Sequence, residues 1–276
     1  MAQVTLADIT KLRKATSAGM MDCKNALDEA NGDFETAIDI IRKKGQLVAN
    51  KRAERDATEG VVLSAVTPDH KYGVVVALNC ETDFVAKNEQ FVALVETFLV
   101  AAIANKPANL DALKAIVIDG RTIDAHVTER VGVTGEKMEL SYFGSISAEK
   151  VISYIHPGNQ LACIVGFTKN VENEQACKDI AMQVAAMAPV AVDKDFVTKD
   201  QIEKELEIGR EQARAEGKPE NMIEKIAEGK LNKFFKESTL LNQDFIKDNK
   251  KSVKAYLQSI DKDLNVVGFC RFGLKG

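Results

Sequence analysis

The sequence predicts an α+β protein in which three short N-terminal helices precede two related subdomains of antiparallel sheet with packed helices, and in which an antiparallel helical hairpin is inserted near the C-terminus. Three observations predict this arrangement. In residues 1–55, apolar residues recur at helical spacing between turn residues. Residues 60–104 and 140–188 each contain β-rich runs followed by a helical pattern, which is a weak internal repeat. Residues 198–237 are helical throughout, with a narrow apolar stripe.

The N-terminal segment should form three helices around one small core. Thr5, with Asp8 three residues later, matches an imperfect capping box and should begin the first helix. Asn31 and Gly32 accept a left-handed conformation, so they should end the second helix. We expect Gly45 to end the third helix. The charged segment Asn50–Asp56 should form a linker or a solvated helical tail, which places a domain boundary near residue 55.

Two subdomains of antiparallel sheet are expected beyond that boundary. Val61–Val66 and Tyr72–Leu78 are β-rich runs on either side of a turn sequence, and they predict a hairpin that is covered on one face by the apolar helix that follows. We assign a core N-subdomain to residues 56–138, and a core C-subdomain to residues 139–197 together with 238–276.

The C-subdomain should combine several strands with two helices. Its strands are predicted at Glu139–Phe143, Val151–Ile155, Leu161–Phe167 and Asn265–Phe272, and its helices at Glu174–Ala186 and Val253–Ile260. The intervening segment, residues 198–237, has a GKP turn at its centre and an apolar stripe too narrow to make a domain alone. It should therefore form a protruding helical hairpin, a coiled coil.

The composition is that of an ordinary globular protein, with 45% apolar and 28% charged residues. The net charge of -4 offers no basic footprint for nucleic acid. The five cysteines are scattered without C-x-x-C spacing, so we expect reduced thiols and no zinc site. No secretory signal pattern is present, and the apolar run Phe91–Ala104 is shorter than the roughly 20 residues of a membrane span. We expect a cytoplasmic protein with no membrane partner.

No pattern in the sequence indicates catalysis. The three histidines, His70, His126 and His156, are far apart and lack ligand or triad spacing. The sequence contains neither a G-x-x-x-x-G-K-[ST] loop nor a G-x-G-x-x-G turn, so it has no recognisable phosphate-binding loop of its own. We therefore expect a protein that is not an enzyme and that needs no metal or cofactor.

A basic cluster raises a nucleic-acid-binding alternative. Basic residues gather at Arg42–Lys44 and again at Lys51–Arg55 on a small helical domain, as they do in helix-turn-helix DNA-binding proteins. Acidic residues interleave with the second group. This mixture favours a solvated linker over a DNA-binding surface.

Three apolar residues are candidates for exposed contact positions. Met20 and Met21 point about 100° apart on a helix, so both cannot be buried in so small a module. Phe84 lies in the polar segment Asn79–Asn88, between a strand and a helix. It either folds back as a hydrophobic staple or stands exposed as an anchor for a partner's pocket. Local sequence does not decide between these two alternatives.

Several longer motifs resemble one known family. The segments that carry the resemblance are LRKATSAGMMDCKNAL (Leu12–Leu27), NCETDFVAKN (Asn79–Asn88), SYIHPG (Ser153–Gly158), IAMQVAA (Ile180–Ala186) and EGKLNKFF (Glu228–Phe235). Together they resemble the bacterial elongation factor Ts family, the nucleotide-exchange factors of the GTPase elongation factor Tu. The resemblance extends over nearly the whole chain.

The resemblance implies a fold and a partner. Residues 1–55 would form a ubiquitin-associated-like module on the nucleotide-binding domain of elongation factor Tu, and Phe84 would wedge into the switch region beside the magnesium site. The GTPase would bind in its GDP-bound and nucleotide-free forms, with no direct nucleic-acid contact; self-association is left open. The implied partner-binding residues are Thr82, Asp83, Phe84 and Val85 in the magnesium-dislocation loop, Arg13, Met20, Met21 and Lys24 in the N-terminal module, and His156 in the C-subdomain.

Three features depart from the family pattern. Ser17 stands where the family usually has glycine, which a type I turn tolerates and a left-handed position does not. Val131–Tyr142 keeps Gly135 and Glu136 but lacks the arginines that often follow them. The sequence ends at Gly273–Gly276, without the further C-terminal helical module of some members. An adaptor for ubiquitin-like proteins is a further alternative, but it leaves the second motif unexplained.

Overall fold

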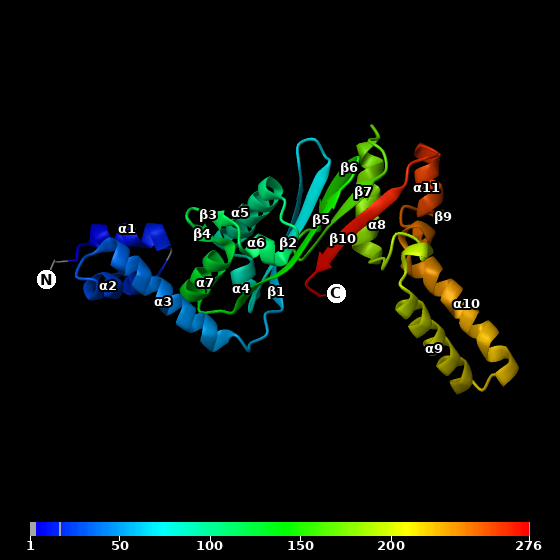
Figure 1. Cartoon of the computed structure of the whole chain (residues 1–276), viewed down its shortest axis with the longest axis horizontal. Helices are drawn as coiled ribbons and strands as arrows, with labels where there is room; N and C mark the ends of the chain where they lie inside the picture. The colour runs from blue at the N-terminus through cyan, green and yellow to red at the C-terminus, as the bar shows by residue number, and fades with distance from the viewer. Residues whose placement is uncertain (1–3, 17, 276) are drawn as a thin grey trace.

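The computed structural model describes residues 4–16 and 18–275, and it has the α+β architecture that the sequence predicts. Figure 1 shows an elongated molecule, with the N-terminal helices at one end, the strands in the middle and a helical hairpin at the other end. Ser17, one of the departures from the family pattern, lies outside the described residues. Within the described ranges, no helix combines the length and the apolar character needed to cross a bilayer.

Local capping signals correctly predict where the first N-terminal helix begins and where the second ends. The N-terminal helices are α1 (Leu6–Thr16), α2 (Met20–Glu29) and α3 (Phe34–Arg52). Thr5 N donates to Asp8 Oδ2 at 3.1 Å while Asp8 N donates to Thr5 Oγ1 at 3.2 Å, so the capping box is confirmed. After α2, Asn31 and Gly32 take φ values of 52° and 86°, as expected for residues that end a helix.

The prediction that Gly45 ends the third helix is wrong, because α3 continues through it to Arg52. Gly45 instead faces Gly132 of α7 (Ile123–Thr134). A Cβ on Gly132 would lie 2.5 Å from the Cα of Gly45, and a Cβ on Gly45 would lie 3.3 Å from the carbonyl oxygen of Thr128. Glycine here lets two helix backbones cross closely. The crossing joins the N-terminal helices to the rest of the molecule.

The first sheet contains β1 (Glu59–Val66), β2 (Tyr72–Cys80) and β5 (Met138–Ser147), antiparallel and in the order β1-β2-β5. The predicted hairpin of its first two strands is confirmed. The strand predicted at Glu139–Phe143 as part of the C-subdomain lies in this sheet instead, where β5 pairs with β2. Periodicity reveals a strand but not its pairing partner.

Helices and short strands surround this sheet. Those that follow β2 are α4 (Asp83–Ala86), α5 (Glu89–Asn105), α6 (Leu110–Lys114), β3 (Val117–Ile118) and β4 (Arg121–Thr122). From α5, Phe91, Val95 and Phe98 enter a core that also contains β1, β2 and α7 side chains. This core supports the turn that carries Phe84.

The second sheet has the order β10-β7-β6, formed by β10 (Val266–Gly273), β7 (Leu161–Phe167) and β6 (Lys150–Ile155). Its core includes residues of α8 (Glu174–Met187) and α11 (Val253–Ile260). The smaller elements near this unit are two 3-10 segments (Lys194–Phe196 and Leu240–Asn242), β8 (Asp244–Phe245) and β9 (Asp248–Ser252). Buried Val62, Val75 and Ile164 belong to a further apolar cluster that joins the two sheets.

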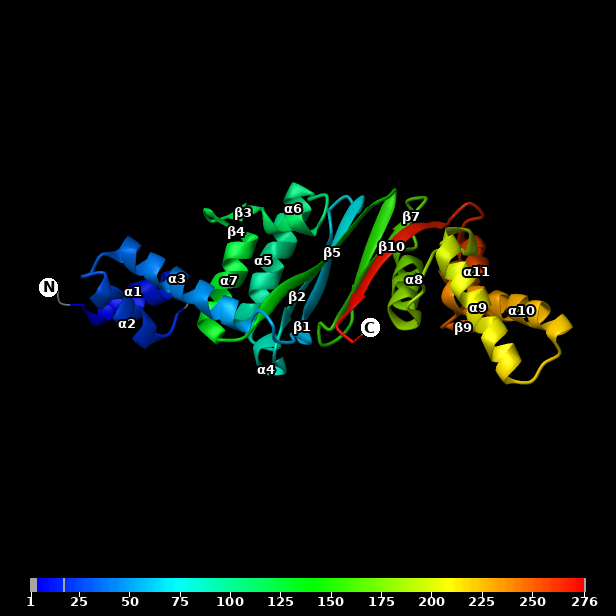
Figure 2. The same cartoon turned by 60° about the horizontal axis from the view of Figure 1, so that its bottom comes forward.

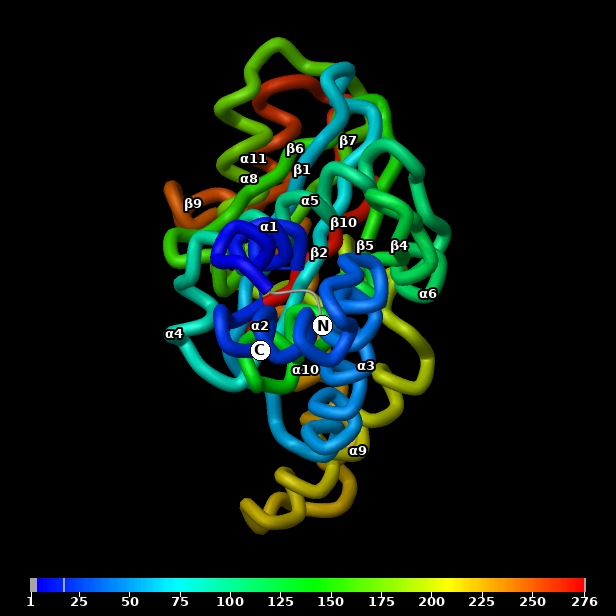
Figure 3. Tube along the Cα trace, turned by 90° about the vertical axis from the view of Figure 1, so that its left-hand side faces the viewer, coloured from blue at the N-terminus to red at the C-terminus, as the bar shows by residue number. Residues whose placement is uncertain are grey.

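The predicted helical hairpin is confirmed as α9 (Lys199–Ala215) and α10 (Glu220–Ser238). Gly217 forms the turn with φ 69°, and Gly209 brings the two helices together, since a Cβ there would lie 3.2 Å from Ala227 Cβ. Figure 2 shows the hairpin extending away from the sheets. In Figure 3, which looks from the N-terminal helices, α4 stands out at one side and the hairpin extends below.

Candidate functional site

Phe84 lies on a one-turn helix between the first sheet and α5. Its side chain is 84% exposed, whereas Ala86 of the same turn is buried in the core. The staple alternative is therefore excluded, because a staple requires the aromatic ring to pack on the protein. The turn exposes a large apolar side chain that its own fold does not cover.

Thr82 and Glu136 brace the start of this turn. Thr82 Oγ1 donates to Glu136 Oε1 at 2.6 Å, and Thr82 N donates to Glu136 Oε2 at 3.1 Å. The same hydroxyl accepts from Val85 N at 3.4 Å as the N-cap of α4. One carboxylate thus holds both the backbone and the side chain of the capping residue. The exposed Phe84 is carried by a fixed turn.

Glu81 forms a second brace, directly before Thr82. Its Oε1 accepts from Lys137 N at 2.6 Å, and its Oε2 accepts from Arg55 Nη1 at 3.0 Å. Arg52 Nη1 lies 4.0 Å from the same carboxylate, whose side chain is only 17% exposed. Charged residues that the sequence suggested were a linker or a solvated helical tail therefore connect the end of α3 to the Phe84 turn.

Asp83 points outward beside Phe84. Lys87 Nζ donates to Asp83 Oδ2 at 2.6 Å, one helical turn away. This hydrogen bond is the main reason why the pKa of Asp83 lies below its usual value. The turn therefore presents an ionised carboxylate next to an aromatic ring at neutral pH.

The buried thiol of Cys80 contacts the backbone at the start of the turn. Cys80 Sγ donates to the carbonyl oxygen of Thr82 at 3.2 Å. Burial, with a contribution from nearby Glu136, raises the pKa of Cys80 to about 12. The thiol is therefore protonated at neutral pH, and it serves packing and hydrogen bonding rather than reactivity.

The candidate residues of the N-terminal module all lie on its surface. Met20 and Met21 are 47% and 65% exposed, so the expectation that at least one is exposed is confirmed. Arg13 on α1 and Lys24 on α2 are exposed as well. These residues and the Phe84 turn belong to separate elements, so the structure offers an extended surface and not one pocket (Figure 1).

His156 lies in the turn after β6, on the second sheet. It is exposed, and its Nδ1 lies 3.1 Å from the hydroxyl of Tyr154, with the two ring centroids 6.1 Å apart. Its backbone N donates to the carbonyl oxygen of Leu161 at 2.8 Å. Both contacts orient the imidazole of a surface turn.

The arrangement suits recognition of another macromolecule. Among residues 4–16 and 18–275 no group of three His, Cys, Asp or Glu side chains is placed to hold a metal ion. An exposed aromatic beside a carboxylate, on a turn braced by two further carboxylates, is the type of anchor that fills a pocket on a partner. Glu81 and Glu136 were not predicted as site residues, because their partners lie 26 to 56 positions away in sequence.

Comparison with known proteins agrees with the motifs. Residues 81–275 match the family described as Elongation factor TS. The chain is 54% identical over 272 residues to the elongation factor Ts of Porphyromonas gingivalis, covering 98% of each chain. It is 50% identical over 275 residues to that of Christiangramia forsetii, covering 99% of this chain and all of the relative.

A third relative, the elongation factor Ts of Cytophaga hutchinsonii, is 50% identical over 277 residues, covering 99% of this chain and 100% of that protein. Identity at this level, over nearly the full length of each relative, is carried by the whole chain and not by a shared motif alone. The chain, with its braced Phe84 turn and its projecting hairpin, belongs to the elongation factor Ts family of translation elongation factors.

Proposed function

We propose that this chain is a nucleotide-exchange factor that binds elongation factor Tu and promotes release of GDP during translation elongation. Membership of the elongation factor Ts family supports the partner and the reaction. The observation that carries the mechanism is the 84% exposure of Phe84 on a turn held by Glu81 and Glu136. The factor acts without catalytic residues, and cytoplasmic translation is its setting.

Exchange of this kind follows from thermodynamic linkage. An exchange protein that binds the nucleotide-free GTPase more tightly than the GDP-bound form must weaken nucleotide binding by the same ratio. Magnesium neutralises much of the phosphate charge in such GTPases, so displacement of its ligands removes a large part of the nucleotide affinity. Phe84 is the wedge that enters the partner beside this site, and Asp83 contacts the partner next to it.

The rest of the chain supplies additional contacts. In this proposal residues 1–55 form a unit that contacts the nucleotide-binding domain through Arg13, Met20, Met21 and Lys24. Residues 56–138 carry the loop Thr82–Val85. Residues 139–197 with 238–276 bring His156 to the partner, and residues 198–237 form the projecting coiled coil. Contacts at several separate surfaces fit the elongated shape in Figure 1.

Stopped-flow release of a fluorescent GDP analogue from elongation factor Tu tests the proposal. The wild-type chain should accelerate release, and Phe84→Ala should reduce the acceleration by about tenfold or more, as expected for an aromatic hot spot. Asp83→Ala should reduce it less. Phe196→Ala is the matched control, because Phe196 is 69% exposed on a different segment. Its rate should equal that of wild type.

Two results would contradict different parts of the proposal. If the wild-type chain leaves the release rate unchanged, the exchange function is wrong. If Phe84→Ala and Phe196→Ala behave alike while wild type accelerates release, the function holds and the wedge assignment fails.

A further inference from the structure

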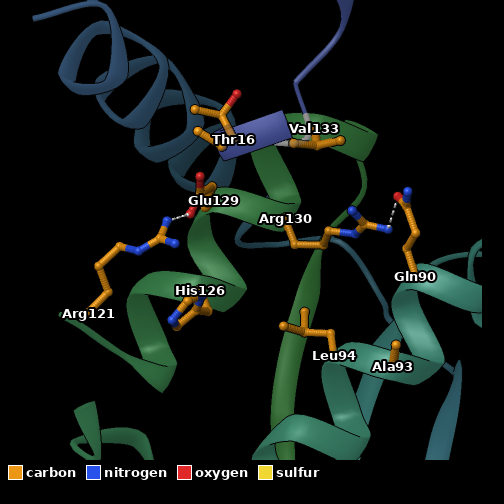
Figure 4. Close-up of a pocket in the computed structure, with 10 residues that line it drawn as sticks. Thr16, Gln90, Ala93, Leu94, Arg121, His126, Glu129, Arg130 and Val133 are labelled. Carbon is orange, nitrogen blue, oxygen red and sulfur yellow. Dashed lines mark hydrogen bonds and ion pairs between the residues drawn. The ribbon is translucent and has the colours of Figure 1, made fainter. Parts of the chain in front are cut away.

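A cavity of about 330 Å³ lies where the end of α1 meets α5 and α7. Figure 4 shows Thr16 and Val133 on one side of it, Arg121 and His126 on another, and Arg130 reaching toward Gln90. Pockets for small ligands begin at about this volume. The exchange function proposed above makes no use of this cavity.

The charged residues of the cavity do not balance. Arg121 forms an ion pair with Glu129, which cancels one charge of each sign. Arg130 has no such partner: its Nη2 donates to two neutral amide oxygens, at 3.4 Å to Asn88 Oδ1 and 3.2 Å to Gln90 Oε1. Within the described ranges, no carboxylate lies at ion-pair distance from it. One positive charge therefore faces the cavity without compensation.

The hydrogen-bonding capacity of Arg130 is also incompletely used. A guanidinium has five N–H donors, and the buried Nε of Arg130 has no acceptor among the described residues. Burial lowers the pKa of this guanidinium, because its charge is partly removed from water. A bound anion would stabilise the charged guanidinium and so offset its loss of hydration.

Unpartnered buried atoms concentrate at this cavity. Four buried side-chain polar atoms lack a hydrogen-bond partner in the described part of the chain, and two of them, Arg130 Nε and Glu129 Oε1, belong to cavity residues. Such atoms are rare in folded proteins and call for an explanation. Because Arg130 Nε is itself buried, a ligand in the cavity would reach this guanidinium through its terminal nitrogens.

Part of the cavity lining is apolar. Ala93 and Leu94 of α5 and Val133 of α7 line it together with Ala15 at the end of α1. An inorganic ion would leave this wall without contacts. The cavity therefore matches a molecule with one charged end and a compact apolar body.

We propose that this cavity binds a small organic oxyanion, a carboxylate or a phosphate monoester, with its charged group on Arg130 and its apolar body against Leu94 and Val133. Arginine suits this role because its planar guanidinium donates two parallel hydrogen bonds to such groups. The ligand also contacts α1, since Ala15 and Thr16 line the same cavity. Binding therefore stabilises the junction between the N-terminal helices and the helices that cover the first sheet.

Isothermal titration of the full chain tests the site with defined probes at one fixed salt concentration. Benzoate and phenyl phosphate carry the two acid groups on the same ring, benzyl alcohol is the neutral counterpart, and inorganic phosphate lacks the apolar body. At least one of the two ring acids should bind saturably and raise the melting temperature. Benzyl alcohol and inorganic phosphate should bind about tenfold more weakly or not at all.

Two variants and one control locate the binding. Arg130→Gln should raise the dissociation constant of the ring acid about tenfold or more, because it removes a charged hydrogen-bond donor. Ala93→Glu places a carboxylate on the cavity wall at an exposed helix position and should repel the anion. Thr97→Glu makes the same change in charge one turn along α5, at an exposed position that does not line the cavity, and should leave the constant unchanged.

The outcomes decide the proposal. Saturable binding that Ala93→Glu weakens and Thr97→Glu does not would support it, even if Arg130→Gln were too unstable to measure. It is overturned if neither benzoate nor phenyl phosphate binds saturably, or if Ala93→Glu and Thr97→Glu bind equally. GDP release serves as an independent measurement, so failure of this site leaves the exchange function untouched.

Discussion

The crossing of α3 and α7 gives a stability prediction that is specific in both sign and size. In Gly132→Ala the new Cβ would lie 2.5 Å from the Cα of Gly45. Carbon atoms in contact normally lie about 3.5–4.0 Å apart, so the two helices must separate by about 1 Å. The obstructing atom is backbone, which cannot rotate away as a side chain does.

The magnitude follows from two opposing effects. Overpacking typically costs about 1–3 kcal/mol, and the upper half of that range applies to a rigid backbone neighbour. Replacing a helical glycine by alanine stabilises the helix by about 1 kcal/mol. We therefore expect Gly132→Ala to lower the free energy of unfolding by about 1–2 kcal/mol.

Gly229→Ala is the matched control, because a Cβ at Gly229 in α10 would meet no atom within 4 Å. It should raise the free energy of unfolding by about 1 kcal/mol. The difference between the two variants, about 2–3 kcal/mol, isolates the steric cost, since the helix propensity change is the same in both. Gly45→Ala, whose Cβ would lie 3.3 Å from a carbonyl oxygen, should fall between them.

Urea unfolding followed by circular dichroism, with linear extrapolation to water, measures these differences. If Gly132→Ala and Gly229→Ala change the free energy of unfolding equally, the two helices do not cross as closely as described. The role of Gly45 as a close-approach residue would then also be wrong.

Three further predictions concern the Phe84 turn and the buried thiols. Glu136→Ala removes both hydrogen bonds to Thr82, each worth about 1.5–3 kcal/mol when one partner is charged. The melting temperature and the GDP release rate should therefore both fall. An unchanged release rate would show that the brace is dispensable. Phe84→Ala should leave the urea midpoint within error of wild type, because its side chain is 84% exposed, and a loss comparable to a core truncation would contradict that exposure. Burial raises the pKa of Cys80 and Cys163 to about 12, above the value near 8.5 of an unfolded thiol. The native state therefore keeps protons that the unfolded state loses, so the free energy of unfolding measured in urea should decline as pH rises above about 9. A flat profile between about pH 8 and 11 would refute this.

Some features of the fold follow from neighbouring residues and were predicted correctly. The capping pair Thr5 and Asp8 and the left-handed pair Asn31 and Gly32 act within one helical turn, so their residue types suffice to locate helix ends. The hairpin of β1 and β2 is local in the same sense. The elements themselves could therefore be predicted along most of the chain.

Other features depend on residues far apart in sequence and were not predicted. β5 was assigned to the second subdomain, because a strand pattern does not reveal which strand it pairs with. Gly45 has the residue type of a helix end, and only its contact with Gly132 shows why the helix continues. The segment expected to be a linker or a solvated helical tail is likewise part of the brace, because Arg55 pairs with Glu81 across 26 positions.

The sequence by itself determined the family, the helix ends that are marked by local caps and the short list of candidate contact residues, because motifs, caps and periodicity are properties of neighbouring residues. The tertiary structure decided that Phe84 is exposed, that Glu81 and Glu136 hold its turn, and that Arg130 faces a cavity without a carboxylate partner in the described chain. The exposure of a side chain and the compensation of its charge depend on which neighbouring residues the fold places around it. Those neighbours come from distant segments, and no local pattern encodes them.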